Sequence, residues 1–374
     1  MTQAFRYPSS TNFHPALSNL AVGFLREQDQ FPQNKYIQYV QAPSPHYWYT
    51  KIDRDEIVRM RQPRDYLWAD GAKRFSTGVG PTEINVGFRE QEVFLNRYAF
   101  VTTIGNQTLN RHEDQWGYKR WLLKTLVSKA MTSRAIILWQ GGPGGGSEGT
   151  TTNWGGLDNA SSWPSTNTAD ANTLNGGAGS WATAGSDPGN PGTYMAIRKS
   201  IMTAVNQIFL QTNGVVSYEQ LRMVISPNLA KIISNTDEIR DAYKYGPFAK
   251  EMIEGGKQNY NDRFGLPPYY AGVEIVVENT PYTNDLPTAG QTTYSTSRAY
   301  VKADNKACIL TRQGAIDSPG GPSFSTVQLA WFQKQLGTQE FVDAEDELTK
   351  MSVVDYYAVI GPAMEAGYLI TGCF

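Results

Sequence analysis

The segment that decides the fold is residues 181–245, which read WATAGSDPGNPGTYMAIRKSIMTAVNQIFLQTNGVVSYEQLRMVISPNLAKIISNTDEIRDAYKY. From Thr193 onward, apolar residues recur at the spacing of one helix face. The residues on this face are Ile197, Ile201, Ala204, Val205 and Ile208. The pattern predicts a helix that starts near Thr193 and ends near Gly214, a residue suited to a C-terminal cap.

A strand and further helices follow this first helix. The apolar run LRMVI at residues 221–225 predicts a short buried strand. Ser226 can then cap a helix whose first position is Pro227. Helical signals continue through TDEIRDAYKY and, more weakly, over residues 247–256. The segment therefore predicts a helix–strand–helix unit.

The C-terminal third of the chain is expected to consist mainly of strands. Runs rich in β-branched and aromatic residues lie at 273–278, 308–311, 324–332, 353–360 and 367–370. No internal repeat is present. Together with the helices, these strands predict an α+β protein.

Towards the N-terminus the pattern changes to an arm and a hairpin. Residues 1–62 are rich in Pro, Tyr, Gln and Asn and predict an extended arm. Within residues 63–105, Ile84, Val86 and Phe88 alternate with polar residues, and alternation resumes from Phe94 to Phe100. We expect two strands of a projecting β-hairpin with a glycine-containing tip near residues 70–80. Because an isolated hairpin is marginally stable in water, this one requires a neighbour.

Residues 106–140 are expected to contain a long helix. Apolar residues at helical spacing begin at Trp116 and continue to Ala130, and the acidic pair Glu113 and Asp114 suits a helix N-terminus. These signals predict a helix over residues 113–133. The apolar run at 134–139 is expected to form a short strand that leads into glycines.

Residues 141–192 form a long insertion dominated by Gly, Asn, Thr, Ser, Asp and Ala, for which we expect a mobile loop with little regular structure. It contains the spacing of a dinucleotide-binding turn at Gly144, Gly146 and Gly149, and a Gly-x-Ser-x-Gly triplet centred on Ser147. Both motifs need a following helix, whereas TTTNWGGLDNASSWP follows here. No lysine follows the glycines as a phosphate-binding loop requires.

Other catalytic arrangements have little support. The three histidines, His14, His46 and His112, all precede Ser147, which excludes the usual order of a hydrolase triad, and none are paired at metal-ligand spacing. The acidic run with Asp343, Glu345, Asp346 and Glu347 is expected to be a solvated turn between strands, although carboxylate pairs for glycoside chemistry stay open. The lone cysteines Cys308 and Cys373 are expected to be buried. We predict no enzyme, no cofactor and no metal site.

The composition favours a protein that contacts other proteins. Charged residues make up 18% of the 374 residues and aromatic residues 12%, whereas soluble domains carry roughly 25% charged residues. Large protein interfaces are enriched in aromatic residues and depleted in Lys and Glu. The formal charge is −2 and no run of Lys or Arg exceeds two, so sequence-specific nucleic-acid binding is not indicated. No signal peptide or membrane span is present in the sequence, which predicts a soluble protein made inside a cell.

The order of these elements resembles the major capsid proteins of tailed bacteriophages, which have the Hong Kong 97-type fold. The similarity is most specific over the segment quoted first. It continues in RFGLPPYYAGVEIVVENTPY and in the ending VVDYYAVIGPAMEAGYLITGCF, and it covers about residues 60–374.

The resemblance implies a division of the chain into parts. Residues 1–62 would be the N-arm, 63–105 the E-loop, 106–140 the spine helix of the peripheral domain, 193–323 the axial domain, and 324–374 the peripheral-domain strands with a C-terminal return. The insertion at 141–192 departs from the family pattern. Residues at the E-loop tip would contact a neighbouring subunit: Trp68, Asp70, Lys73, Arg74 and Phe75.

The function implied by the resemblance is a non-catalytic shell protein. It would assemble with itself into pentamers and hexamers of an icosahedral head in the host cytoplasm, and would reside in the virion. Its further partners would be a portal, a separate scaffold or decoration proteins, and packaged double-stranded DNA bound without sequence specificity, with no membrane. Some family members cross-link subunits through an E-loop lysine, a role open to Lys73, but no partner Asn is identifiable here. The alternatives are an encapsulin-like compartment shell and, from another class, a carbohydrate-active enzyme or binding module.

Overall fold

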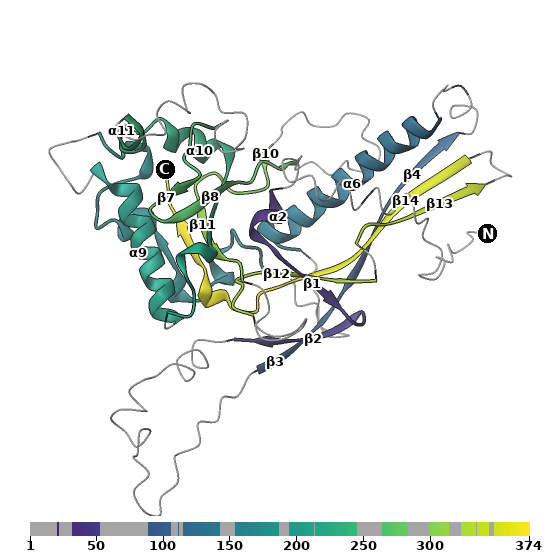
Figure 1. Ribbon diagram of the computed structural model, residues 1–374, viewed down its shortest axis with the longest axis horizontal. Helices are drawn as coiled ribbons and strands as arrows, with labels where there is room; N and C mark the ends of the chain where they lie inside the picture. The colour runs from purple at the N-terminus through teal and green to yellow at the C-terminus, as the bar shows by residue number, and fades with distance from the viewer. Residues whose placement is uncertain are drawn as a thin grey trace, which may run out of the picture.

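A computed structural model describes residues 21, 32–52, 89–105, 111, 115–142, 154–186, 194–212, 214–244, 264–282, 299–313, 323–333, 335–343 and 348–374. Two β-sheets form the body of the molecule, and the long helix α6 (Gln115–Gln140) runs along the first of them (Figure 1). The α+β class predicted from the sequence is confirmed. In the described part of the chain, no helix is long and apolar enough to cross a membrane.

The first sheet is built around the long strand β14 (Leu348–Ile360). One edge of β14 pairs antiparallel with β4 (Asn96–Gly105), and its other edge pairs antiparallel with β13 (Gly337–Asp343) and β12 (Gln328–Phe332). Strand β1 (Gln38–Ala42) runs parallel to β12. The buried face of α6 packs on this sheet in a cluster made of Leu123, Leu126, Val127, Ala130, Met131, Ile104, Met351 and Val353.

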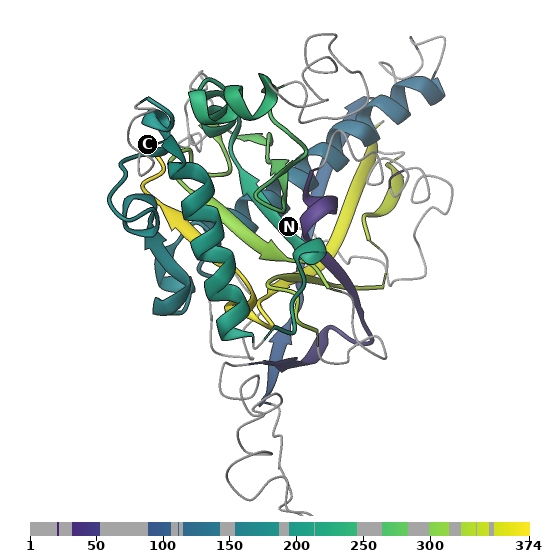
Figure 2. The ribbon, with the colours of Figure 1, turned by 60° about the vertical axis from the view of Figure 1, so that its left-hand side comes forward.

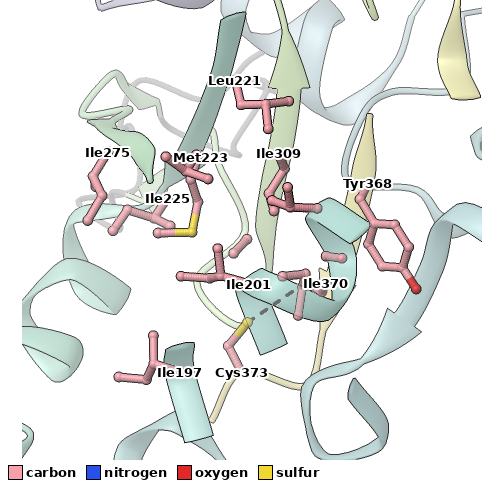
Figure 3. Close-up of a cluster of buried hydrophobic side chains, with 14 of the residues drawn as sticks. Ile197, Ile201, Leu221, Met223, Ile225, Ile275, Ile309, Tyr368, Ile370 and Cys373 are labelled. Atoms are coloured by element: carbon pink, nitrogen blue, oxygen red, sulfur yellow. Dashed lines mark hydrogen bonds between the residues drawn. The ribbon is translucent and has the colours of Figure 1, made fainter. Parts of the chain in front are cut away.

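The second sheet has six strands in the order β5, β15, β11, β6, β8, β7. Their bounds are β5 (Thr168–Asp170), β15 (Tyr368–Thr371), β11 (Ala307–Thr311), β6 (Leu221–Ile225), β8 (Val273–Val277) and β7 (Tyr269–Tyr270). Helix α9 (Ala196–Gln211) covers one face of this sheet (Figure 2). Ile197 and Ile201 of the helix belong to one buried cluster with Met223, Ile309 and Ile370 of the strands (Figure 3).

The helix–strand–helix unit is confirmed in detail. The predicted stripe of α9 is buried, strand β6 has the predicted bounds, and α10 (Pro227–Ser234) begins where the capping signal places it. The backbone N–H of Leu229 donates to Oγ of Ser226 at 3.1 Å. Helix α11 (Asp237–Lys244) follows, whereas residues 247–256 lie outside the described part.

The expectation of an extended arm over residues 1–62 is corrected for its last part. Residues 32–52 contain α2 (Gln33–Tyr36), β1 and β2 (His46–Lys51) and belong to the body of the fold. Pro43 and Pro45, which suggested an extended arm, lie between β1 and β2. A proline is tolerated there because no backbone N–H has to donate to a neighbouring strand. Ile52 is buried in the core beneath the second sheet.

Most of the predicted hairpin, including its tip and Ile84, Val86 and Phe88, lies outside the described part. β3 (Arg89–Phe94) pairs antiparallel with β2, not with the strand that follows it, and β4 continues into the first sheet beside β14. The sequence could not show this pairing because residues 53–88 separate β2 from β3 along the chain. β2 and β3 therefore hold the two ends of this segment side by side, and we call the paired strands the base of the hairpin.

Helix α6 is longer than expected, since residues 134–139 continue the helix and do not form a strand. The helical face stays buried through Arg134, Ala135 and Leu138. A cation at position 134 interrupts the apolar pattern, but its side chain is neutralised by a buried partner, Asp355 of β14.

The insertion at 141–192 is more ordered than expected over residues 154–186. This part contains three 3₁₀ turns (Ala160–Ser162, Ser165–Asn167 and Trp181–Thr183), strand β5 and helix α7 (Ala171–Leu174). Its tryptophans anchor it, because Trp163 Nε1 donates to the Leu157 carbonyl at 2.9 Å and Trp181 Nε1 donates to Ser200 Oγ at 3.1 Å. Residues 143–153, which hold both glycine motifs, lie outside the described part.

Most of the remaining predicted strands are present. β8, β11, β14 and β15 match four of the five runs, and β12 occupies the end of the fifth. β13 was not predicted. It pairs with β14 up to Asp343 and Leu348. Glu345, Asp346 and Glu347 of the acidic run lie outside the described part, so the expected turn stays a prediction. The pairs β9 (Pro281–Tyr282) and β10 (Ala299–Tyr300), and the 3₁₀ turns Tyr218–Gln220 and Met364–Ala366, complete the elements described.

Candidate assembly surfaces

The base of the hairpin is the first candidate surface. The predicted contact residues Trp68, Asp70, Lys73, Arg74 and Phe75 lie outside the described part, so their positions stay a prediction. What the structure describes is the ribbon that carries them, β2 paired with β3 from His46 and Phe94 to Lys51 and Arg89. The ribbon lies at the lower edge of the two sheets in Figure 1.

Alternation along β2 gives this ribbon two different faces. Tyr47 and Tyr49 are buried in a cluster with Val93, Ala330 and Ile360, which fixes the ribbon to the first sheet. Between them, Trp48 is 54% exposed. The Trp48 indole therefore projects into solvent from the base of the hairpin. A contact with another chain would remove this large apolar side chain from water.

The far end of the first sheet carries a second group of exposed apolar side chains. Trp116 and Trp121 of α6, Val101 of β4 and Phe341 of β13 are all exposed. The ring of Trp121 stacks on Tyr118, with centroids 5.9 Å apart. A soluble monomer rarely leaves this many large apolar residues on one end of one unit.

The outer side of α9 forms a third group on the second sheet. Met202 and Leu210 lie off the buried stripe, and Leu210 is 61% exposed. Tyr218 is exposed beside this helix and packs edge-on against Phe209, with centroids 4.9 Å apart. Tyr269 of β7 is also exposed. A surface pocket here is lined by Arg198, Met202, Tyr218, Tyr270, Ala271 and Gly272.

A buried carboxylate fixes the start of α9 beneath this surface. Glu238 accepts hydrogen bonds from the backbone N–H groups of Ile197 at 2.9 Å and Arg198 at 2.8 Å, and from the Tyr270 hydroxyl at 2.5 Å. A carboxylate at this place complements the positive end of the helix dipole. Burial nevertheless raises the pKa of Glu238 above its usual range, although the three hydrogen bonds lower it.

A buried polar network surrounds Trp139, near the end of α6. Its indole Nε1 donates to the Tyr36 hydroxyl at 3.1 Å, and that hydroxyl donates to Glu278. On the other side, the Lys302 ammonium lies 4.7 Å from the centroid of the indole and pairs with Asp158. These contacts connect α2, α6, the ordered part of the insertion and the residues that follow β8 and β10.

The described residues include no activated cysteine and no metal-ligand cluster. Burial raises the pKa of both thiols, that of Cys373 to about 12, so neither is a ready nucleophile. Both cysteines are buried and unpaired, as the sequence predicted. Within the described ranges, no group of three or more His, Cys, Asp or Glu side chains is placed to hold a metal ion.

The buried side of α9 was predicted from the sequence, but its exposed apolar side was not. Met202 and Leu210 fall outside the stripe of Ile197, Ile201 and Ile208, and this offset is the signal that could have revealed a second apolar face. The exposed position of Trp48 could have been found from the alternation of β2 once that strand was recognised.

Comparison with known proteins supports the fold. No protein-family model and no curated protein matches the chain. A phage-related protein from Bordetella bronchiseptica RB50 is structurally similar, with 15% identity, a TM-score of 0.57, and coverage of 97% of this chain and 98% of that one. Two weaker similarities are to the capsid of the cyanophage P-SCSP1u, with 12% identity, a TM-score of 0.48 and coverage of 99% and 92%, and to the mature capsid of bacteriophage PhiM1, with 11% identity, a TM-score of 0.45 and coverage of 90% and 84%.

The similarity to the Bordetella protein extends over nearly the whole of both chains. The two chains therefore share a fold. The α+β class predicted from the sequence is confirmed, and the Hong Kong 97-type assignment stays a prediction.

Proposed function

We propose that this chain is the major capsid protein of a tailed bacteriophage, which assembles into pentamers and hexamers of an icosahedral shell around double-stranded DNA. The observation that carries the proposal is the ribbon of β2 and β3, which is fixed to the first sheet on one face and presents Trp48 on the other. The exposed Trp48 is the side chain of this ribbon that a neighbouring chain would remove from water.

The distribution of exposed apolar residues supports the same function. They occur at the hairpin base, at the far end of the first sheet and along α9, which are three separate parts of the body. A subunit of a closed shell has several neighbours and needs several contact surfaces, whereas a dimer needs one self-complementary patch. The role is structural and involves no catalysis.

The remaining features of the proposal follow from a shell. The protein would assemble in the host cytoplasm and reside in the virion, with a portal and a separate scaffold or decoration proteins as partners. Residues Trp68, Asp70, Lys73, Arg74 and Phe75 would contact the adjacent subunit.

Deletion of residues 70–80 tests the hairpin assignment. Since β2, β3 and their buried contacts are retained, we expect a subunit with the circular dichroism and thermal unfolding of the full chain, but few closed particles in sucrose gradients. Particles of normal yield and size from this variant would contradict the assignment. Particles that contain a co-purifying cargo enzyme and no DNA would instead favour an encapsulin-like shell.

A further inference from the structure

Strand β4 forms one edge of the first sheet. It pairs with β14 from Asn96 and Tyr357 to Gly105 and Leu348, and no described strand pairs with its other side. β13 lies along the opposite edge of β14, over residues 348–354 (Figure 1). In an antiparallel edge strand, every second residue turns its backbone N–H and C=O away from the neighbouring strand. The outer side of β4 therefore offers these groups to a further strand.

The other edge strands of the two large sheets carry features that discourage such pairing. β13 contains two acidic residues, Glu340 and Asp343. β1 has five residues and is followed by Pro43. In the second sheet, β5 has three residues, and β7 has two and is preceded by Pro268. Charges, prolines and short length are the means by which proteins prevent a sheet edge from pairing with another chain.

Strand β4 has none of these features over residues 98–105. The whole strand has ten residues, and this part of it, YAFVTTIG, contains no charge and no proline. Phe100 and Ile104 pack in the cluster beneath α6. The alternate residues Ala99, Val101 and Thr103 face the other way and are exposed, Val101 by 55%. A long, uncharged edge strand with exposed apolar groups is expected to pair with another chain.

We propose that β4 pairs antiparallel with β4 of a second copy of this chain across a twofold axis, which joins the first sheets of two subunits into one. The inference deepens the proposed function and rests on it, because it names one contact between subunits. Charge favours a second copy as the partner. Two identical strands oppose like charges wherever they are charged, and residues 98–105 carry none.

A register centred on Thr102 gives the strand suitable partners. Thr102 then lies opposite the same residue of the second copy, Val101 lies opposite Thr103, and Phe100 lies opposite Ile104. Opposed β-branched and aromatic side chains are among the cross-strand pairs that stabilise a sheet. The strand is therefore complementary to itself in backbone groups, in side chains and in charge.

The helices above the joined sheet fit beside each other. α6 packs on both β4 and β14, and adjacent strands are about 4.8 Å apart. A helix centred over these two strands lies about 5 Å from a twofold axis that passes outside β4. The axis is perpendicular to the sheet, so the two copies of α6 would lie antiparallel on the same face, roughly 10 Å apart, which is the spacing of packed helices.

The side of α6 next to this axis carries an exposed indole. Lys119 pairs with Glu340 of β13 and so marks the side of the helix towards the other edge of the sheet. Trp121 and Ser128 lie about 200° and 180° around the helix from Lys119, on the side towards β4. Trp121 is 60% exposed in the subunit. The second copy would remove this indole from water.

Engineered cysteines test the contact directly. In Thr102→Cys, the two new thiols would face each other across the axis, where opposed Cβ atoms are close enough for a disulfide. Cys308 and Cys373 are buried and unpaired, so they do not compete. The control is Gln41→Cys, at an exposed residue of the edge strand β1. After mild oxidation of the full-length proteins, we expect at least ~10-fold more covalent dimer from Thr102→Cys than from the control on a non-reducing gel.

A second pair of variants tests the edge without a disulfide. Val101→Lys places a charge on the outer strand at an exposed residue, and Gln41→Lys places the same charge on β1. We expect Val101→Lys to lower the yield of particles by at least ~10-fold and Gln41→Lys to stay within about twofold of the full chain. Thermal unfolding checks that both variants are folded.

Equal amounts of dimer from the two cysteine variants, or a normal particle yield from Val101→Lys, would overturn the proposal. Either result together with closed particles from the full chain would reject the β4 contact and leave the shell function standing. An absence of particles from the full chain would count against the shell function itself. The cysteine test needs only two subunits, so it decides the β4 contact in that case as well.

Discussion

The guanidinium of Arg134 and the carboxylate of Asp355 form a bidentate pair, with Nε 2.6 Å from Oδ2 and Nη2 2.7 Å from Oδ1. Both side chains are fully buried, and the guanidinium lies 5.3 Å from the centre of the Tyr357 ring. The pair joins α6 to the central strand β14. Burial lowers the pKa of Arg134, but the neighbouring Asp355 raises it by more, so the charge is retained.

Asp355→Asn is expected to lower the free energy of unfolding by about 3–5 kcal/mol, because it leaves a buried guanidinium without a counter-charge. Urea unfolding of the unassembled subunit measures this loss. The double variant Arg134→Met, Asp355→Leu should be less destabilised than the single variant, since apolar replacement of both partners removes the unpaired charge. A loss below about 1 kcal/mol for Asp355→Asn would show that the pair is not a fixed part of the fold.

Glu278 provides a prediction about pH. It is buried and accepts hydrogen bonds from Thr280 Oγ1 at 2.5 Å, from the Thr280 backbone N–H at 3.1 Å and from Tyr36. Burial raises the pKa of Glu278 above its usual value of 4.5, although these hydrogen bonds lower it. A carboxyl with a raised pKa in the folded state favours folding most when protonated, below pH 4.5, and this contribution is lost as the pH rises through the raised value.

Glu278→Gln removes the titration and keeps a group that can accept from Tyr36. We therefore expect the stability of this variant, relative to the full chain, to increase as the pH is raised from 4 to 8. Urea unfolding of both proteins at several pH values gives this difference. A difference that is constant over the range would contradict the raised pKa of Glu278.

Leu210→Lys tests the outer side of α9. Since Leu210 is exposed in the subunit, the change in unfolding free energy should stay within about 0.5 kcal/mol. If α9 meets a neighbouring subunit, the buried charge should reduce particle yield by at least ~10-fold. The control Ala160→Lys places the same charge at an exposed residue of the first 3₁₀ turn and should assemble normally. Equal particle yields from the two variants would exclude this side of α9 from the contacts.

Gly156→Ala tests the junction between α6 and the ordered part of the insertion. Gly156 has a φ of +83°, and an added Cβ would lie 2.6 Å from the Trp139 carbonyl oxygen. Gly176 has a similar φ of +78° but open space at the Cβ position. We expect Gly156→Ala to lower the unfolding free energy by about 2–4 kcal/mol and Gly176→Ala by about 1 kcal/mol. Thermal unfolding that ranks the two equally would show that the insertion is not held against the end of α6.

The parts predicted correctly from the sequence are those with local signals. The stripe of α9, strand β6 and the Ser226 cap depend on residues a few positions apart. The end of α6 was predicted wrongly because the stabilising partner of Arg134 is Asp355, far away in the sequence. The regular structure within residues 154–186 was not predicted for a similar reason. Indole groups such as that of Trp181 form hydrogen bonds to other elements of the fold, and such contacts leave no periodic pattern in the sequence.

The candidate surfaces were predictable only in part. The hairpin was expected, but β2 was assigned to an arm because its partner β3 lies beyond residues 53–88.

The most direct test of the proposed shell is negative-stain electron microscopy of the purified full-length protein, with light scattering on the same chromatographic fractions. We predict closed particles tens of nanometres across, or rings of five and six subunits. A monodisperse monomer of 41.5 kDa at every salt and protein concentration, including in the presence of a crowding agent, would contradict self-assembly and with it the proposed function.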